Sequence, residues 1–168
     1  RLFCLSGHVD RPGVYEVPFG TTLGSLIERA GGATTSLSAV LLGGAAGQFV
    51  GRDRLDLPLT LEDTRAAGLS LGSGMVMVFD DTVDFGPVVT RIAEFFRHES
   101  CGQCVPCRVG TVRQHELLTG PLDTTPLDTA LLHDIARVMA DASICGLGHT
   151  ASAAVRSAID LGLIGATR

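Results

Sequence analysis

The sequence has no tryptophan, a single tyrosine and no lysine, so all 13 of its basic residues are arginines. Its formal net charge of −5 at pH 7 argues against nucleic-acid binding, which needs a basic face to displace counterions from phosphates. No uninterrupted apolar run reaches the roughly 18 residues of a membrane span, so direct membrane insertion is not expected. The first residue is Arg1, with neither an initiator methionine nor a signal peptide, and we expect the chain to be part of a longer polypeptide.

Phosphate-binding motifs are also missing. The glycine-rich stretch 43–47 has neither the lysine–serine/threonine pair of a P-loop nor a G-x-G-x-x-G spacing, so it is interpreted as a turn. The hydrophobic content of 45% is nevertheless ample for a core, which the scarcity of aromatic residues makes mainly aliphatic. A length of 168 residues fits one domain or two small ones.

Four of the five cysteines have the arrangement of metal ligands. Cys101, Cys104 and Cys107 are spaced C-x2-C-x2-C, and Cys145 follows in a distant, glycine-flanked segment. Four thiolates are what one cubane iron–sulfur cluster requires, one per iron. The triple run lacks the further cysteine and proline of two-cluster ferredoxins, so Cys145 is the candidate for the fourth ligand. Reduced cysteines of this kind fit a cytoplasmic compartment.

Three other roles for these cysteines compete with a cluster. Structural zinc usually takes two separated C-x2-C pairs or a Cys2His2 set, and His149 is the only imidazole near Cys145. A thioredoxin-like C-x-x-C follows a strand, whereas this run follows a predicted helix. A disulfide framework is disfavoured by the odd number of cysteines and by a chain long enough to fold without cross-links.

Residues 1–82 have the pattern of a small α+β domain of the β-grasp kind, with a helix on one face of a sheet. The predicted strands are 2–9, 14–17, 37–42 and 75–79. A helix is predicted from Thr21 or Thr22 to Arg29, stopped by two glycines. His8 is expected to be an ordinary surface or sheet residue. Cys4, in an apolar strand, is expected to be a small buried hydrophobe.

Residues 83–168 change to a helical period. The predicted helices begin at Phe85 with Asp84 as cap, near Pro106, at Thr125-Pro126 and at Thr150. Short loops between apolar-faced helices favour an antiparallel four-helix bundle, in which both cysteine-bearing loops lie at the same end. The two halves are expected to be separable at about residues 80–84, where two adjacent aspartates favour an exposed junction.

Four segments carry a resemblance to a known family: 6–18 (SGHV…PGVYEVP), 71–74 (LGSG), 99–108 (ESCGQCVPCR) and 144–148 (ICGLG). On these motifs, the chain resembles the C-terminal part of the NADH-oxidising flavoprotein subunits. That family includes the complex I subunit, the diaphorase subunit of NAD-reducing hydrogenases and the β subunit of NAD-dependent formate dehydrogenases. The resemblance implies a β-grasp, SLBB-like domain at 1–82. It also implies an all-α four-helix domain at 83–168 with one [4Fe-4S] cluster on Cys101, Cys104, Cys107 and Cys145.

The function implied by the resemblance is an electron relay between FMN and further iron–sulfur clusters. The FMN and NAD sites would belong to an N-terminal domain that has no counterpart in these residues. The implied partners are a [2Fe-2S] thioredoxin-like subunit and an iron–sulfur-rich subunit of one oxidoreductase, in the cytoplasm or at the cytoplasmic face of a membrane complex. The segment 109–111 favours the formate dehydrogenase type.

The groups expected around the cluster are backbone N–H donors and one charge. The residues are Gly102, Gln103, Gly146 and Arg108, and they would set the cluster potential. An ion pair of Arg108 with Glu99 or Glu94 is the competing role for that side chain. For the whole chain, the competing function is a non-redox interaction module stapled by zinc.

Overall fold

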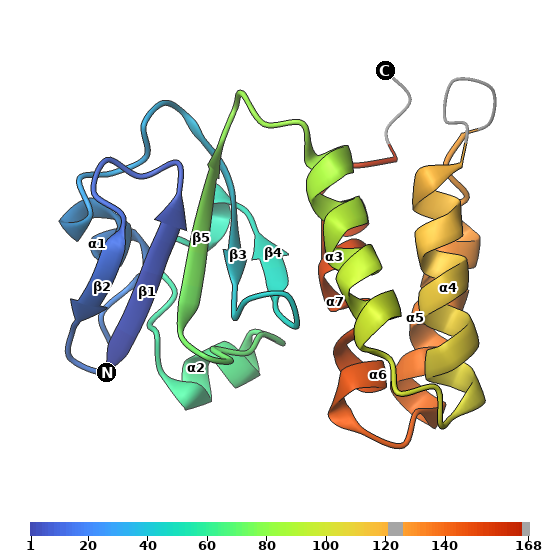
Figure 1. The fold of residues 1–168 in the computed structure, drawn as a ribbon. Helices are drawn as coiled ribbons and strands as arrows, with labels where there is room; N and C mark the ends of the chain where they lie inside the picture. Colours follow the sequence, from blue (N-terminus) through green and yellow to red (C-terminus); the bar gives the residue numbers. More distant parts are fainter. Residues whose placement is uncertain (121–125, 166–168) are drawn as a thin grey trace. The chain divides into compact units, whose positions relative to one another are not determined.

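The computed structural model describes residues 1–120 and 126–165. It divides the chain into two compact units, Arg1–Val83 and Asp84–Arg168 (Figure 1). The first unit contains a five-stranded mixed sheet, and the second contains helices only within its described residues. The predicted α+β class therefore holds at the level of a mixed sheet plus several helices.

The sheet of the first unit has the strand order β2-β1-β5-β3-β4. Its strands are β1 (Leu2–Gly7), β2 (Gly13–Glu16), β3 (Leu37–Leu42), β4 (Gln48–Val50) and β5 (Met75–Asp80). The central pair β1 and β5 is parallel, and the pairs β1–β2, β3–β5 and β3–β4 are antiparallel. The first and last strands of the unit therefore lie side by side in the middle of the sheet, as Figure 1 shows.

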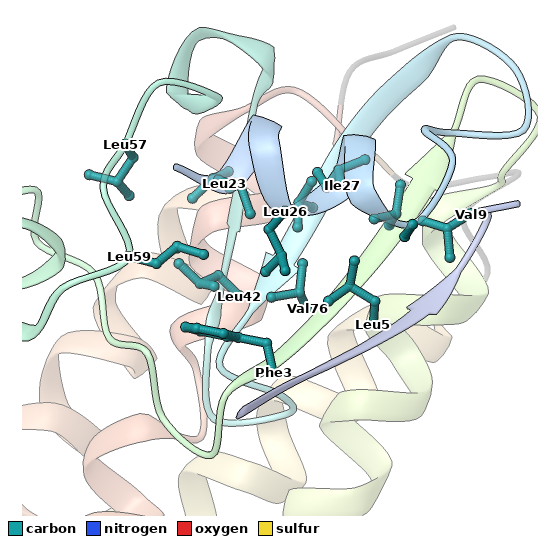
Figure 2. Close-up of a cluster of buried hydrophobic side chains, with 14 of the residues drawn as sticks. Phe3, Leu5, Val9, Leu23, Leu26, Ile27, Leu42, Leu57, Leu59 and Val76 are labelled. Atoms are coloured by element: carbon teal, nitrogen blue, oxygen red, sulfur yellow. The ribbon is translucent and has the colours of Figure 1, made fainter. Parts of the chain in front are cut away.

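The core of this unit lies between one face of the sheet and helix α1 (Leu23–Arg29) (Figure 2). Strand β1 sends Phe3 and Leu5 into this core, each about 1% exposed. Successive residues of a strand point to opposite faces, so Cys4 between them points away from this core and is exposed. The prediction of a buried Cys4 was therefore wrong, because it considered the apolar character of the strand and not its alternation.

Helix α1 begins and ends where the sequence predicts. Thr22 is the N-cap, and its hydroxyl accepts the Ser25 N–H at 3.2 Å. The helix stops before Gly31 and Gly32, whose φ angles of +91° and +84° belong to the left-handed region. The sequence did not predict β4, the 3-10 turn η1 (Arg52–Arg54) or the short helix α2 (Leu61–Ala66).

Asp80, at the end of β5, is buried and heavily hydrogen-bonded. Its carboxylate accepts hydrogen bonds from the Thr82 hydroxyl at 2.6 Å and the Thr34 hydroxyl at 2.8 Å, and His8 Nδ1 lies 3.1 Å away. These bonds, that of Thr82 first, hold the pKa of Asp80 well below its ordinary value, although burial opposes them. The expected exposed junction was thus wrong for Asp80, whereas Asp81 is exposed.

The second unit consists of helices α3 (Phe85–Glu99), α4 (Val105–Thr119), α5 (Thr129–Ala142), α6 (Gly146–Thr150) and α7 (Ala153–Asp160). Helix α3 packs on α4 and α7, and α5 packs on α4 and α7, while α6 contacts α4 and α5. Asp84 caps α3 as predicted, with its carboxylate accepting the Gly86 N–H at 3.0 Å. The predicted fourth helix corresponds to α7, which begins at Ala153 and not at Thr150, and the short helix α6 lies in the segment predicted to be a loop. The predicted four-helix bundle stays a prediction.

The predicted start of the third helix falls partly on Thr125, which lies outside the described residues. The helix itself begins at Thr129, where the Asp128 carboxylate accepts the Leu131 N–H at 2.9 Å. Among the described residues, no helix combines the length and the apolar character needed to cross a bilayer.

Candidate metal centre

The four predicted ligands line one cavity at one end of the second unit. Cys101 and Cys104 lie in the turn between α3 and α4, Cys107 lies in the first turn of α4, and the turn between α5 and α6 carries Cys145. Figure 1 shows both turns at the same end of the helices. The cavity has a volume of about 250 Å³. A single water needs only about 10–15 Å³ of such volume, so the space suits a group of several atoms.

The cysteines surround this cavity at different depths. Cys107 is buried, Cys104 is half-buried, and Cys101 and Cys145 are exposed. Every cysteine of the chain lies among the described residues, and each one is a free thiol. The remaining lining residues are Glu99, Ser100, Gln103, Ile144 and Leu147.

Two of the cysteines are helix N-caps. Cys104 caps α4 and Cys145 caps α6, and neither uses its side chain to bond the first turn of its helix. The first N–H groups of an α-helix have no partner within the helix, and they give its start a partial positive charge. The two helix starts therefore favour negatively charged sulfur at the rim of the cavity.

Cys104 is the cysteine whose thiolate is most clearly stabilised by the protein. The backbone N–H of Ile144 lowers the pKa of the Cys104 thiol most, and the N–H of Cys107 adds to this effect. Burial acts in the opposite direction but does not overcome them. Because Ile144 precedes Cys145 in the distant segment, this contact joins the two cysteine-bearing turns.

The first turn is fixed by a glycine and an arginine. Gly102 has φ +75°, which L-residues with a side chain rarely adopt. Arg108 Nη1 donates a hydrogen bond to the Gly102 carbonyl at 2.9 Å. Within the described part of the chain, Arg108 forms no ion pair with Glu94 or Glu99, and its predicted effect on the cluster potential stays a prediction.

Each of the two cysteine-bearing turns carries a serine. Ser100 Oγ lies 3.3 Å from Cys107 Sγ and accepts the Gly102 N–H at 3.4 Å. Ser143 is buried, and its hydroxyl contributes to the lowered pKa of the Cys104 thiol. This hydroxyl nevertheless reaches standard hydrogen-bond geometry with no described residue. Neither serine was predicted, although each stands one or two positions before a cysteine.

The space around Ser143 is closed by Gly148 of α6. A Cβ atom on Gly148 would collide with the side chain of Ser143 and would come within 3.0 Å of Cys107 Cβ. A glycine is therefore required where α6 passes the two cysteine turns. The sequence motif contains this glycine, but its packing role could not be inferred without the structure.

In residues 1–120 and 126–165, no group of three or more His, Cys, Asp and Glu side chains converges as ligands of one ion. His149, the imidazole considered for zinc, has its Nε2 atom 2.7 Å from the Ser143 carbonyl oxygen. The thiols are therefore spread around a cavity instead of meeting at one point.

Of the other predicted residues, Gln103 lines the cavity, and Gly102 and Gly146 flank residues that line it. The N–H donors that act on Cys104 belong to Ile144 and Cys107, which the sequence motifs did not indicate. The predicted donor role of Gly102, Gln103 and Gly146 stays a prediction.

Comparison with known proteins identifies two domains. Residues 87–161 match the NADH-ubiquinone oxidoreductase-F iron-sulfur binding region, and residues 2–46 match the SLBB domain. The iron–sulfur region contains both cysteine-bearing turns. Its 4Fe-4S designation agrees with a site of four cysteines.

Several relatives, all F-type subunits of NADH-quinone oxidoreductases, are similar over almost the whole chain. The relative from Mycobacterium bovis is 40% identical over 164 residues, which cover 94% of this chain and 36% of that protein. The one from Streptomyces coelicolor is 39% identical, with 94% and 36% covered. A third, from Rhizobium meliloti, is 37% identical over 166 residues, with 95% and 39% covered. The chain thus spans little more than a third of the length of these relatives.

A solved structure gives the same result. An NAD+-reducing [NiFe]-hydrogenase in its H2-reduced state matches with a TM-score of 0.83 and 36% identity, over 95% of this chain and 28% of that one. The predicted resemblance to NADH-oxidising flavoprotein subunits is therefore confirmed: the chain is similar to the SLBB domain over residues 2–46 and to the NADH-ubiquinone oxidoreductase-F iron-sulfur binding region over residues 87–161.

Proposed function

We propose that Cys101, Cys104, Cys107 and Cys145 hold one [4Fe-4S] cluster and that the chain is the electron-transfer portion of an NADH-linked oxidoreductase. The observation that carries this proposal is the convergence of four free thiols on one cavity of about 250 Å³. Two helix starts and two backbone N–H groups favour thiolate there, as iron ligation requires. The match of residues 87–161 to an iron–sulfur binding region supports the same assignment.

When bound, such a cluster passes one electron at a time, whereas NADH gives up a two-electron hydride, so a flavin stands between the two. The chain contributes the ligands and their surroundings. Arg108 and Gly102 keep the first turn in its conformation, and Ile144 ties the second turn to Cys104. The fixed N–H groups and helix starts stabilise negative charge on the sulfurs.

We infer that residues 1–82 form a β-grasp, SLBB-like domain and residues 83–168 the cluster-binding domain. The order β2-β1-β5-β3-β4, with its parallel central pair, supports the first assignment. In the second, α3, α4, α5 and α7 would serve as the four-helix arrangement, with α6 as an added turn beside Cys145. FMN and NAD would be bound by an N-terminal part of a longer polypeptide, in keeping with the greater length of the relatives.

The partners we propose are the other subunits of a multi-subunit oxidoreductase, including a [2Fe-2S] thioredoxin-like subunit and an iron–sulfur-rich subunit. The relatives are subunits of an NADH-quinone oxidoreductase and an NAD+-reducing hydrogenase, which supports either kind of parent complex. A formate dehydrogenase parent rests only on residues 109–111. The free thiols support a reducing compartment, and we infer the cytoplasm.

The test is metal content after anaerobic reconstitution of the full chain with iron and sulfide. We expect four irons and four acid-labile sulfides per chain, a brown protein, and a paramagnetic signal after reduction with dithionite. A colourless chain that takes up one zinc in preference to iron would overturn the proposal. That result would favour the zinc-stapled interaction module.

A further inference from the structure

Each cysteine-bearing turn presents a serine hydroxyl to a different thiol. Ser100 Oγ is 3.3 Å from Cys107 Sγ, a distance at which either atom could donate. A thiolate ligand has no proton, so in the ligated state the hydroxyl must be the donor. The Gly102 N–H donates to Ser100 Oγ at 3.4 Å, which leaves the serine proton free to point at Cys107.

The second hydroxyl belongs to Ser143 and is buried. The residue is only 8% exposed, and its Oγ is a buried polar atom that reaches no described partner with standard geometry. Buried hydroxyls are rarely left unpaired, and an exception calls for an absent partner. Ser143 directly precedes Ile144, which lines the same cavity as Cys104. A ligating sulfur on this cavity, that of Cys104, is the candidate acceptor for the hydroxyl.

We propose that Ser100 and Ser143 are the residues that raise the cluster's reduction potential, by donating hydrogen bonds to the ligating sulfurs of Cys107 and Cys104. This inference rests on the proposed function. Reduction adds one electron from an external reductant, with no proton transferred and no bond broken. The added charge resides partly on the sulfurs, so a donor stabilises the reduced state more than the oxidised one.

The arrangement assigns the two serines to the two most enclosed sulfurs. Cys107 is 5% exposed and Cys104 is half-buried, whereas Cys101 and Cys145 are exposed and are accessible to water. A hydrogen bond has its greatest electrostatic effect where water does not compete. The two serines therefore act where a protein donor has the largest influence on the potential.

The experiment is a dithionite redox titration of the reconstituted full chain, followed by electron paramagnetic resonance, with iron counted in every variant. Ser100→Ala and Ser143→Ala should keep four irons and should each lower the midpoint potential. A shift equivalent to about tenfold in the reduction equilibrium corresponds to 59 mV for one electron. Thr119→Ala is the control, because its hydroxyl bonds the His115 carbonyl at the far end of α4.

Ser100→Thr and Ser100→Val form a second pair of equal shape, of which only the threonine keeps the hydroxyl. We expect the threonine variant to retain the wild-type potential and the valine variant to lower it. Serine variants with four irons and unchanged potentials would overturn the inference and leave the proposed function standing. Loss of iron from every variant without a hydroxyl, with the threonine variant intact, would make the role structural and would also overturn it. A wild-type chain without iron would refute both.

Discussion

Gln114 of α4 and Ser152, between α6 and α7, share a buried hydrogen bond in which the Ser152 hydroxyl donates to Gln114 Oε1 at 2.5 Å. The Gln114 amide group in turn donates to the Ala151 carbonyl at 3.2 Å. This polar link joins α4 to the short segment between α6 and α7.

Gln114→Leu should destabilise the second unit by about 1–3 kcal/mol, because it leaves the buried Ser152 hydroxyl and Ala151 carbonyl without their partner. Unfolding in denaturant, followed by the circular dichroism of the helices, measures this change in the free energy of unfolding. The double variant Gln114→Leu/Ser152→Ala should lose less than the sum of its two single variants, since removing both partners abolishes part of the penalty. If the losses of the two single variants add up to the loss of the double variant, the hydrogen bond makes no coupled contribution to stability.

Cys145→Ala should prevent the reconstituted chain from holding a complete four-iron cluster. The substitution leaves one iron without a thiolate, so a three-iron species or an apoprotein is expected. Metal binding is linked to folding, and helical stability should therefore fall together with iron content. The control is Cys4→Ala, which alters an exposed thiol in the other unit and should change stability by no more than about 0.5 kcal/mol. A Cys4 variant that loses iron while the Cys145 variant keeps it would contradict the ligand set.

Gly148→Ala should disturb the cysteine turns from the side of α6. Its methyl group would collide with Ser143 and would lie 3.0 Å from Cys107 Cβ, and overpacking of this kind costs about 1–3 kcal/mol. We expect lower iron content and a lower midpoint of thermal unfolding. Gly146→Ala in the same helix is the matched control, because a Cβ there meets no described atom within 4 Å. Equal tolerance of both alanines would contradict the tight packing.

Asp80→Asn should change the acid stability of the first unit. The Asp80 pKa is lowered from its ordinary value of 3.8, so the ionised carboxylate stabilises the folded state. That stabilisation is complete above about pH 4 to 5 and is lost as the pH falls through the lower, folded-state pKa. The asparagine variant should be less stable at pH 7 and should lose less stability on acidification.

Tyr15 fluorescence measures this effect, since the chain has one tyrosine, in the first unit, and no tryptophan. Asp56→Asn, at an exposed aspartate of the same unit, is the control and should follow the wild-type pH profile. A parallel pH dependence for wild type and the Asp80 variant would contradict the role of this carboxylate.

The long helices and strands could be predicted because the spacing of apolar and capping residues defines them locally. The grouping of three cysteines likewise follows from their spacing in the sequence. Helix α3 has a full amphipathic period and a capping Asp84, and α1 has Thr22 before it and two glycines after it. Strand β4 has three residues and helix α2 has six, too few for a period to be recognised. Such short elements depend on the contacts made by the rest of the fold.

The sequence predicted which four cysteines line one cavity, but little of what surrounds them. The spacing of Cys101, Cys104 and Cys107 predicts a cluster loop, and their role as ligands stays a prediction. The N–H donor from Ile144 depends on how a turn some 40 residues away approaches Cys104, which spacing does not encode. The predictions that Cys4 is buried and that Asp80 is exposed were both wrong, because the composition of a segment does not give the direction of each side chain.

The cysteines are divided unequally along the chain, with three within residues 101–107 and Cys145 alone on a distant turn. A cluster held by all four would therefore act as a cross-link between two segments some 40 residues apart. It would join the start of α4 to the start of α6, and its removal would release that cross-link.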